Sequence, residues 1–111
     1  MSKFKCGGCG YIWDGDDAPD VCPKCGVPKA RFSQLDEVAA KLVERSRHSN
    51  ALHCRLVDLS RQMEGVCKDG IADKLDPGCV DVFTKALAAS YDIMKQAMTE
   101  MAIHVGKGKW G

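Results

Sequence analysis

Apolar residues change their spacing near residue 32 of this chain. Beyond that point they recur in steps of three and four, which is the period of a helix with one apolar face. Ser33 is suited to cap the start of such a helix, and Asp36 and Glu37 place negative charge at the positive end of its dipole. The first apolar stripe is Leu35, Val38, Leu42, Leu52, Leu56, Leu59 and Met63. The pattern predicts one long helix over about residues 33–64.

A second helical pattern follows a stretch rich in turn residues. Asp76-Pro77-Gly78 is the strongest turn signal within a connection that we place at residues 65–78. The stripe beyond it is Val82, Phe83, Ala86, Leu87, Ser90, Met94, Ala97, Met98, Met101 and Val105. Gly106 is suited to end the helix. The pattern predicts a helix over about 79–105, so residues 33–111 are expected to form an all-α helical hairpin.

Two helices by themselves make a thin core. A homodimer that closes two hairpins into a four-helix bundle would bury both sides of each stripe. We therefore expect the hairpin to dimerise or to dock a partner.

The first 32 residues have a different character. They are rich in Gly, Pro, Cys and Asp and show no helical period. A module this small cannot bury enough apolar surface to stay folded unaided, so it needs a staple such as a metal ion. The sequence thus predicts two domains: a small metal-bound β and knuckle module over 1–32, and the hairpin over 33–111.

Charge and targeting signals narrow the setting. The formal net charge is +1, and five basic side chains face four acidic ones within residues 1–32, so no nucleic-acid partner is indicated. The first residues lack the apolar segment of a secretory signal, and no apolar run is long enough to cross a membrane. We expect a cytoplasmic protein, in which paired cysteines indicate a metal rather than disulfides.

Four of the seven cysteines form two matching C-x2-C-G motifs. They are Cys6-Gly7-Gly8-Cys9-Gly10 and Cys22-Pro23-Lys24-Cys25-Gly26. Two residues between cysteines let a tight turn present both sulfurs to one ion, and the following glycine permits a positive φ angle. Two such knuckles give four sulfur ligands in a tetrahedron, which suits zinc or a single iron. The sequence therefore predicts one metal ion on Cys6, Cys9, Cys22 and Cys25.

The segment FKCGGCGYIWDGDDAPDVCPKCGVPKARF resembles the rubredoxin domain of the short type found in rubrerythrins. An aromatic residue stands two positions before the first cysteine, CGY follows the first knuckle, and C-P-x-C-G forms the second. Only twelve residues separate Cys9 from Cys22, as in the short type. The resemblance covers residues 3–32, a little over a quarter of the chain.

The resemblance implies iron on these four cysteines, cycling between ferric and ferrous, and one-electron exchange with a redox partner protein. It also implies a small aromatic core of Phe4, Tyr11, Trp13 and Phe32. Four thiolates leave no open coordination position, so no substrate binds the metal, and we identify no catalytic residues. Whether the chain is an enzyme stays open, with an electron carrier favoured.

Two alternatives remain. A zinc ribbon would use the same ligands as a structural or interaction module. A diverged rubrerythrin-like enzyme would need a second metal site, yet residues 33–111 contain only four glutamates and no Glu-x-x-His pair. Glu100 and His104 share a helix face and are the better candidates for a second metal or haem, ahead of Glu44 and His48. We interpret His53, Cys54, Cys67, Cys79 and the methionines as interior or idle side chains.

Overall fold

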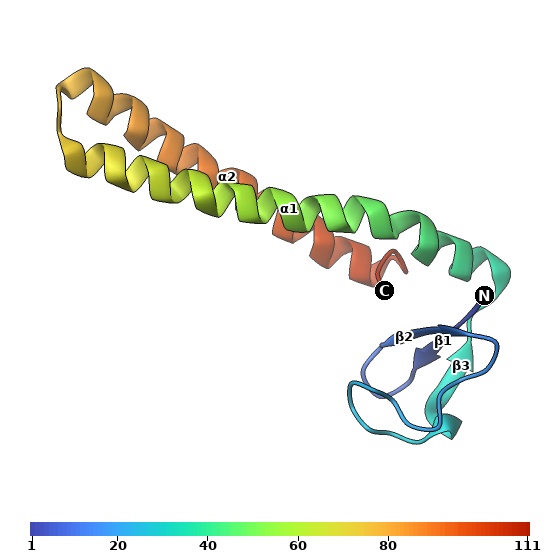
Figure 1. Cartoon of the computed structure of the whole chain (residues 1–111). Helices are drawn as coiled ribbons and strands as arrows, with labels where there is room; N and C mark the ends of the chain where they lie inside the picture. Colours follow the sequence, from blue (N-terminus) through green and yellow to red (C-terminus); the bar gives the residue numbers. More distant parts are fainter. The chain divides into compact units, whose positions relative to one another are not determined.

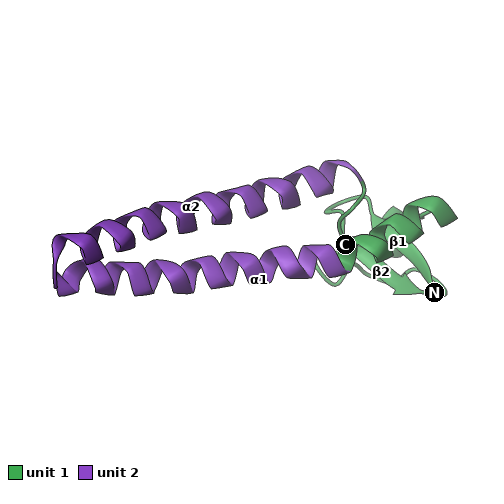
Figure 2. Ribbon diagram, turned by 90° about the horizontal axis from the view of Figure 1, so that it is seen from above, with its two compact units in different colours: residues 1–47, 108–111 green, residues 48–107 purple.

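The computed structural model describes all 111 residues and divides the chain into two compact units (Figure 2). Unit 1 contains residues 1–47 and 108–111, and unit 2 contains residues 48–107. This division does not test the domain boundary expected at residue 32, which stays a prediction.

Unit 1 begins with a small antiparallel sheet in the order β2-β1-β3. The strands are β1 (Ser2–Cys6), β2 (Ile12–Gly15) and β3 (Phe32–Gln34), and a 3-10 turn at Lys29–Arg31 leads into the last of them. Phe4 in the central strand lies opposite Trp13 on one side and Gln34 on the other. A small strand module followed by two long helices confirms the predicted architecture.

Helix α1 spans Glu37–Asp73, so the expected start at Ser33 was wrong. Ser33 belongs to β3 and pairs with Lys5. The cap is Asp36, whose Oδ1 accepts the backbone N–H of Ala39 at 2.8 Å. Either residue type can cap a helix, and pairing of Ser33 in the sheet decides between them.

The connection between the helices is also shorter than the sequence predicted. Helix α1 continues through Gly65 and Gly70, and helix α2 (Pro77–Gly106) begins after only three residues. A Cβ on Gly70 would overlap the ring of Phe83, so this glycine makes room for packing and is not a turn. Asp76 caps α2 by accepting the Cys79 N–H at 2.7 Å, with Pro77 in the first turn.

Within unit 2 the two helices run antiparallel, side by side, along the hairpin (Figure 1). Their contacts include Tyr91 Oη to Glu64 Oε1 at 3.2 Å and the sulfurs of Cys54 and Met101 at 3.8 Å. The side chains that are buried between them are mostly small or polar: Asn50, Ser60, Cys67, Ser90, Ala97 and His104.

The leucine stripe expected to form the core of α1 lies outside this contact. The exposed apolar side chains of its second half are Leu52, Leu56, Leu59, Met63 and Val66. Each of them stands one residue before a position that faces α2. The exposed stripe and the positions in contact with α2, which we call the seam, repeat with the same helical period, so this offset stays constant along the helix. Neither helix is long and apolar enough to cross a membrane.

Candidate metal centre

Two knuckles with the same backbone pattern present the four predicted cysteines. In the first, the Cys6 N–H donates to the Tyr11 carbonyl at 2.8 Å and the Gly10 N–H donates to the Cys6 carbonyl at 2.9 Å. In the second, the N–H groups of Cys22 and Gly26 donate to the Val27 and Cys22 carbonyls, each at 2.9 Å. The repeated bonds explain why the two C-x2-C-G motifs have the same spacing.

Glycine is required at the end of each knuckle because the chain turns there with a positive φ. The angle is +84° at Gly10 and +79° at Gly26, a region that other residues adopt only with strain. Gly8 has a different role, since a Cβ there would lie 3.2 Å from the Cys25 sulfur and 3.3 Å from Val27. The sequence prediction of positive φ after each second cysteine is confirmed.

The knuckles bring the four sulfurs within 4.8 Å of one another. The closest pairs join the two knuckles: Cys6 and Cys25 sulfurs are 3.6 Å apart, and Cys9 and Cys22 sulfurs are 3.7 Å apart. Sulfurs at the corners of a tetrahedron with metal–sulfur bonds of about 2.3 Å would be about 3.8 Å apart. The arrangement therefore fits one tetrahedral metal ion.

Burial divides the cysteines into two kinds. Cys6 and Cys22, the first of each pair, are 2% exposed, whereas Cys9 and Cys25 are exposed. Backbone N–H groups point at the buried sulfurs, from Gly8 to Cys6 at 3.3 Å and from Cys25 to Cys22 at 3.5 Å. Hydrogen bonds of this kind stabilise thiolates and tune a bound metal.

The thiols also influence one another electrostatically. Desolvation opposes ionisation of Cys6, but hydrogen bonds from the Cys9 and Gly8 backbone and from neighbouring thiols lower its pKa to about 6. For Cys9 a backbone hydrogen bond at Tyr11 favours the thiolate, yet desolvation and the other three sulfurs outweigh it and raise the pKa to about 11. Four sulfurs this close cannot all carry charge unless a cation lies among them.

The aromatic residues near the site do not form the expected core. Phe4 is buried, but Tyr11 is 37% exposed, and Trp13 and Phe32 are half-buried. The indole Nε1 of Trp13 donates to the Asp17 carbonyl at 3.1 Å, which fixes the turn after β2. The reason is size, since a module with so few residues has little interior to offer.

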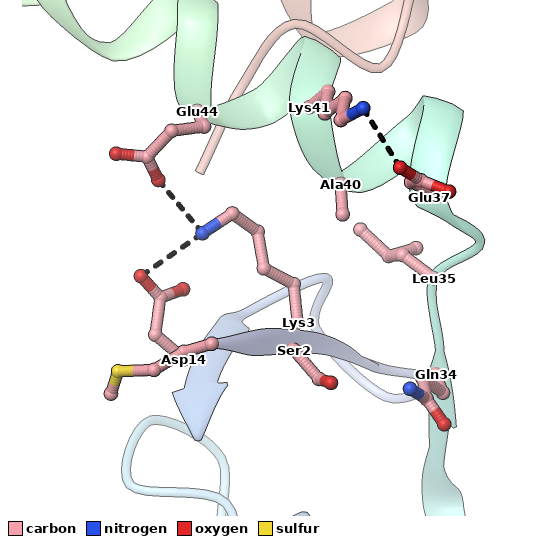
Figure 3. Close-up of a pocket in the computed structure, with 10 residues that line it drawn as sticks. Ser2, Lys3, Asp14, Gln34, Leu35, Glu37, Ala40, Lys41 and Glu44 are labelled. Atoms are coloured by element: carbon pink, nitrogen blue, oxygen red, sulfur yellow. Dashed lines mark hydrogen bonds and ion pairs between the residues drawn. The ribbon is translucent and has the colours of Figure 1, made fainter. Parts of the chain in front are cut away.

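A charge cluster in unit 1 joins the sheet to the helix, and no pattern in the sequence indicated it (Figure 3). Lys3 is 5% exposed and its ammonium lies 3.2 Å from Asp14 and 2.8 Å from Glu44. Arg47 holds both oxygens of Asp14, at 2.6 and 2.8 Å. Hydrogen bonds from Arg47, then from Lys3, lower the pKa of Asp14 to about 2.

This cluster borders a pocket of about 560 Å³, whose lining includes Lys3, Asp14, Leu35, Lys41 and Glu44. The ion pair with Lys3 also accounts for Glu44, which the sequence had offered as a partner of His48. The sequence of charges along α1 does not predict this ion pair, since Lys3 comes from strand β1.

The other candidate residues lie in unit 2. His104 is buried, with Nδ1 2.6 Å from Asn50 Oδ1 and Nε2 3.3 Å from Glu100 Oε1. The rings of His53 and His104 meet edge to face with centroids 6.0 Å apart. Cys67 is buried and Cys79 is half-buried. Across the chain, one group of three or more His, Cys, Asp or Glu can hold a metal ion, and it is the four cysteines.

Comparison with known proteins agrees with the geometry of the first unit. The family "Rubrerythrin, rubredoxin-like domain" matches residues 4–33. Reverse rubrerythrin-1 of Clostridium acetobutylicum is 51% identical over 37 residues, which are 33% of this chain and 20% of that protein. Rubrerythrins of Nitratidesulfovibrio vulgaris and Clostridium perfringens are 47% and 50% identical over 34 residues, 31% of this chain and 18% and 17% of theirs.

The chain thus spans about a fifth of the length of these curated relatives. No solved structure matches it. The family match ends before the helices begin, and it contains all four cysteines together with both knuckle glycines. Residues 4–33 are therefore a rubredoxin-like domain of the rubrerythrin type, with a four-cysteine site for a single metal ion.

Proposed function

We propose that the protein is a one-electron carrier in which Cys6, Cys9, Cys22 and Cys25 hold one iron ion. The observation that carries the proposal is the tetrahedral spacing of four sulfurs in a rubredoxin-like domain. Bound iron would supply a one-electron couple between ferric and ferrous states. The named relatives are rubrerythrins, whose similarity to this segment favours iron over zinc.

The buried and the exposed pair of cysteines have different parts in this function. The buried sulfurs of Cys6 and Cys22 receive backbone N–H bonds, which stabilise the reduced and more negative state. The exposed sulfurs of Cys9 and Cys25 give the site its contact with the surface, where a redox partner protein would approach. Because all four ligand positions are filled by cysteine, the site exchanges electrons and forms no bond to a substrate.

A zinc ribbon is the alternative, since zinc accepts the same four thiolates. The two are distinguished by metal analysis and a visible spectrum of freshly isolated protein. We expect one iron per chain and thiolate-to-iron absorption bands that disappear on reduction and return with air. One zinc per chain in a colourless protein would refute the proposal. A second metal or cofactor per chain would support a rubrerythrin-like enzyme instead.

The helical unit fits a role in dimerisation. The apolar side chains on one side of α1 (Leu52, Leu56, Leu59, Met63 and Val66) are exposed. Exposed Val82 and Ile93 of α2 each stand one residue before a position that faces α1. In an antiparallel helix pair such positions of both helices lie on the same side, so α2 continues the apolar face. A pocket of about 320 Å³ between Leu56, Ile93 and Ala97 opens on this face.

A second copy is the occupant that we propose for this apolar face. Unit 2 buries few apolar side chains of its own, so it gains the core it lacks by closing into a four-helix bundle. Its seven basic and eight acidic side chains nearly cancel, so two copies do not repel each other.

A further inference from the structure

Basic side chains in residues 1–32 differ in their pairing. Lys3 and Lys29 form ion pairs with carboxylates. The other three, Lys5, Lys24 and Arg31, are exposed and form none. The five cations thus form two groups, those with an ion pair and those without one.

All three unpaired cations lie beside the metal-binding knuckles. Lys24 is inside the second knuckle, between its two cysteines. The side chain of Lys5 passes beside Gly10 in the first knuckle, within 3.9 Å of the place where a Cβ would stand. The guanidinium of Arg31 lies beside Gly7, where a Cβ would stand 3.8 Å from Arg31 Nε. The backbone N–H of Gly7 also donates to the Arg31 carbonyl.

Acidic side chains of this segment are engaged elsewhere. Asp14 is held by Lys3 and Arg47, and Asp17 by Lys29. The pKa of the Lys29 ammonium is raised mainly by the hydrogen bond that it donates to Asp17, and the charge of Asp20 adds to this effect. Asp16 follows β2 in the turn that Asp17 and Trp13 close. No carboxylate lies within ion-pair distance of the three knuckle cations.

The surface around the two knuckles exposes apolar side chains as well as cations. We call it the knuckle face and define it as residues 7–11 and 21–26 together with Lys5 and Arg31. It contains the exposed sulfurs of Cys9 and Cys25, Tyr11 at 37% exposure and Val21 at 57%. Protein interfaces combine exposed apolar side chains with charged ones, and the charges guide approach and orientation.

We propose that the knuckle face docks an acidic surface of a redox protein, with Lys5, Lys24 and Arg31 as its recognition residues. The inference rests on the proposed electron transfer and names the kind of partner that the site accepts. Net charge alone gives no such direction, because the formal charge of the chain is only +1 before the metal ion and its four thiolates are counted. The recognition is local, and it acts at the edge where the metal ligands reach the surface.

A redox-inert anion tests the inference without requiring electron transfer. The probe is the paramagnetic hexacyanochromate(III) trianion, added to zinc-loaded protein, with line broadening of backbone amides followed by NMR. We expect broadening concentrated on residues 7–11 and 21–26 at low salt. Raising the ionic strength from about 0.01 to 1 M should remove it, as the Debye length falls from about 30 to 3 Å. The hexaamminechromium(III) trication should leave these amides sharp.

Charge reversal supplies the matched comparison. Lys24→Glu combined with Arg31→Glu should weaken broadening on the knuckle face at least about threefold, since both changes remove attraction and add repulsion. Lys41→Glu reverses a single charge on α1, away from the knuckles, and should leave the map unaltered. Zinc content and amide positions of the variants report whether they fold. Broadening that is uniform, or that persists in the double variant, would overturn the inference.

Failure of the proposed function gives a different result. A protein that binds the anion at the knuckles as zinc form, yet does not exchange electrons when loaded with iron, would refute electron transfer and leave the anionic docking intact. Iron-loaded protein that is oxidised readily by ferricyanide, with a rate independent of salt and of the Lys24 and Arg31 charges, would refute the docking inference alone.

Discussion

At the scale of single residues, replacing glycine by alanine is expected to have opposite effects on stability at two positions. Gly26 ends a knuckle with φ of +79°, and a Cβ there would meet nothing within 4 Å, so only backbone strain opposes a larger residue. Gly65 lies inside α1 and likewise has no neighbour within 4 Å. The sequence predicted the need for glycine after each cysteine pair, because that requirement is local. It misread Gly65 and Gly70 as part of a turn. Packing against the ring of Phe83 explains the glycine at position 70, whereas Gly65 has no such contact and is a glycine tolerated inside the helix.

We predict that Gly26→Ala costs about 1–2 kcal/mol through left-handed backbone strain alone. The measurement is the rate at which a chelator removes the metal, which should rise about tenfold. Gly65→Ala is the control, and it should raise the helical unfolding midpoint because alanine is favoured over glycine by about 1 kcal/mol in a helix. If Gly26→Ala held metal as firmly as the unchanged protein, positive φ would not govern the knuckle.

At the scale of elements, strand and helix in unit 1 are joined by charge. Lys3 from β1, Asp14 from β2 and Glu44 from α1 meet around one ammonium group. The sequence predicted both a strand module and a helix, because each has a local pattern. It did not predict how they join, since nothing in the spacing of charges along α1 identifies Lys3 as their partner. The start of α1 was displaced for a related reason, as pairing of Ser33 in β3 removed it from the role of cap.

The pH dependence of this junction follows from Asp14. Its folded pKa of about 2 lies below the ordinary value of 3.8, so its ionised form stabilises the fold above about pH 4 and this contribution disappears as pH falls toward 2. We predict that Asp14→Asn lowers the free energy of unfolding by about 1–2 kcal/mol at neutral pH. Thermal denaturation of both proteins from pH 7 to pH 2 should show the gap closing below pH 4.

Asp81→Asn is the matched control for that experiment. Asp81 forms an exposed pair with Lys85 one turn further along α2, and such pairs contribute little. Its loss should change stability by less than about 0.5 kcal/mol. A gap for Asp14→Asn that stayed constant down to pH 2 would show that its carboxylate charge is not what stabilises the junction.

At the scale of the whole molecule, the same apolar periodicity is present on two faces of α1, and the sequence alone does not show which face contacts α2. Both the seam between the helices and the exposed leucine stripe repeat in steps of three and four. The expected core residues Leu56 and Leu59 lie on the exposed side, while Ser60 and Asn50 are buried. A leucine-rich stripe that the helices of unit 2 leave exposed is the reason that we propose a second copy.

We predict a mass of about 24 kDa by light scattering, twice the 12.1 kDa of one chain. Leu59→Glu should shift the protein toward the monomer, because it places a charge within the apolar face. Leu75→Glu, in the connection between the helices and 74% exposed, is the control and should leave the dimer unchanged. A single 12 kDa species for the unchanged protein at micromolar concentration would exclude the four-helix bundle.

If the four cysteines hold a redox-active iron, the protein takes up one electron per chain. A potentiometric titration of freshly isolated protein measures this uptake, with the electrons counted against the metal content. We predict one reversible electron per chain and one iron per chain, with the Cys6→Ser variant losing both and the Cys54→Ser variant keeping both. A protein that contains its full metal content yet takes up no electron would contradict it.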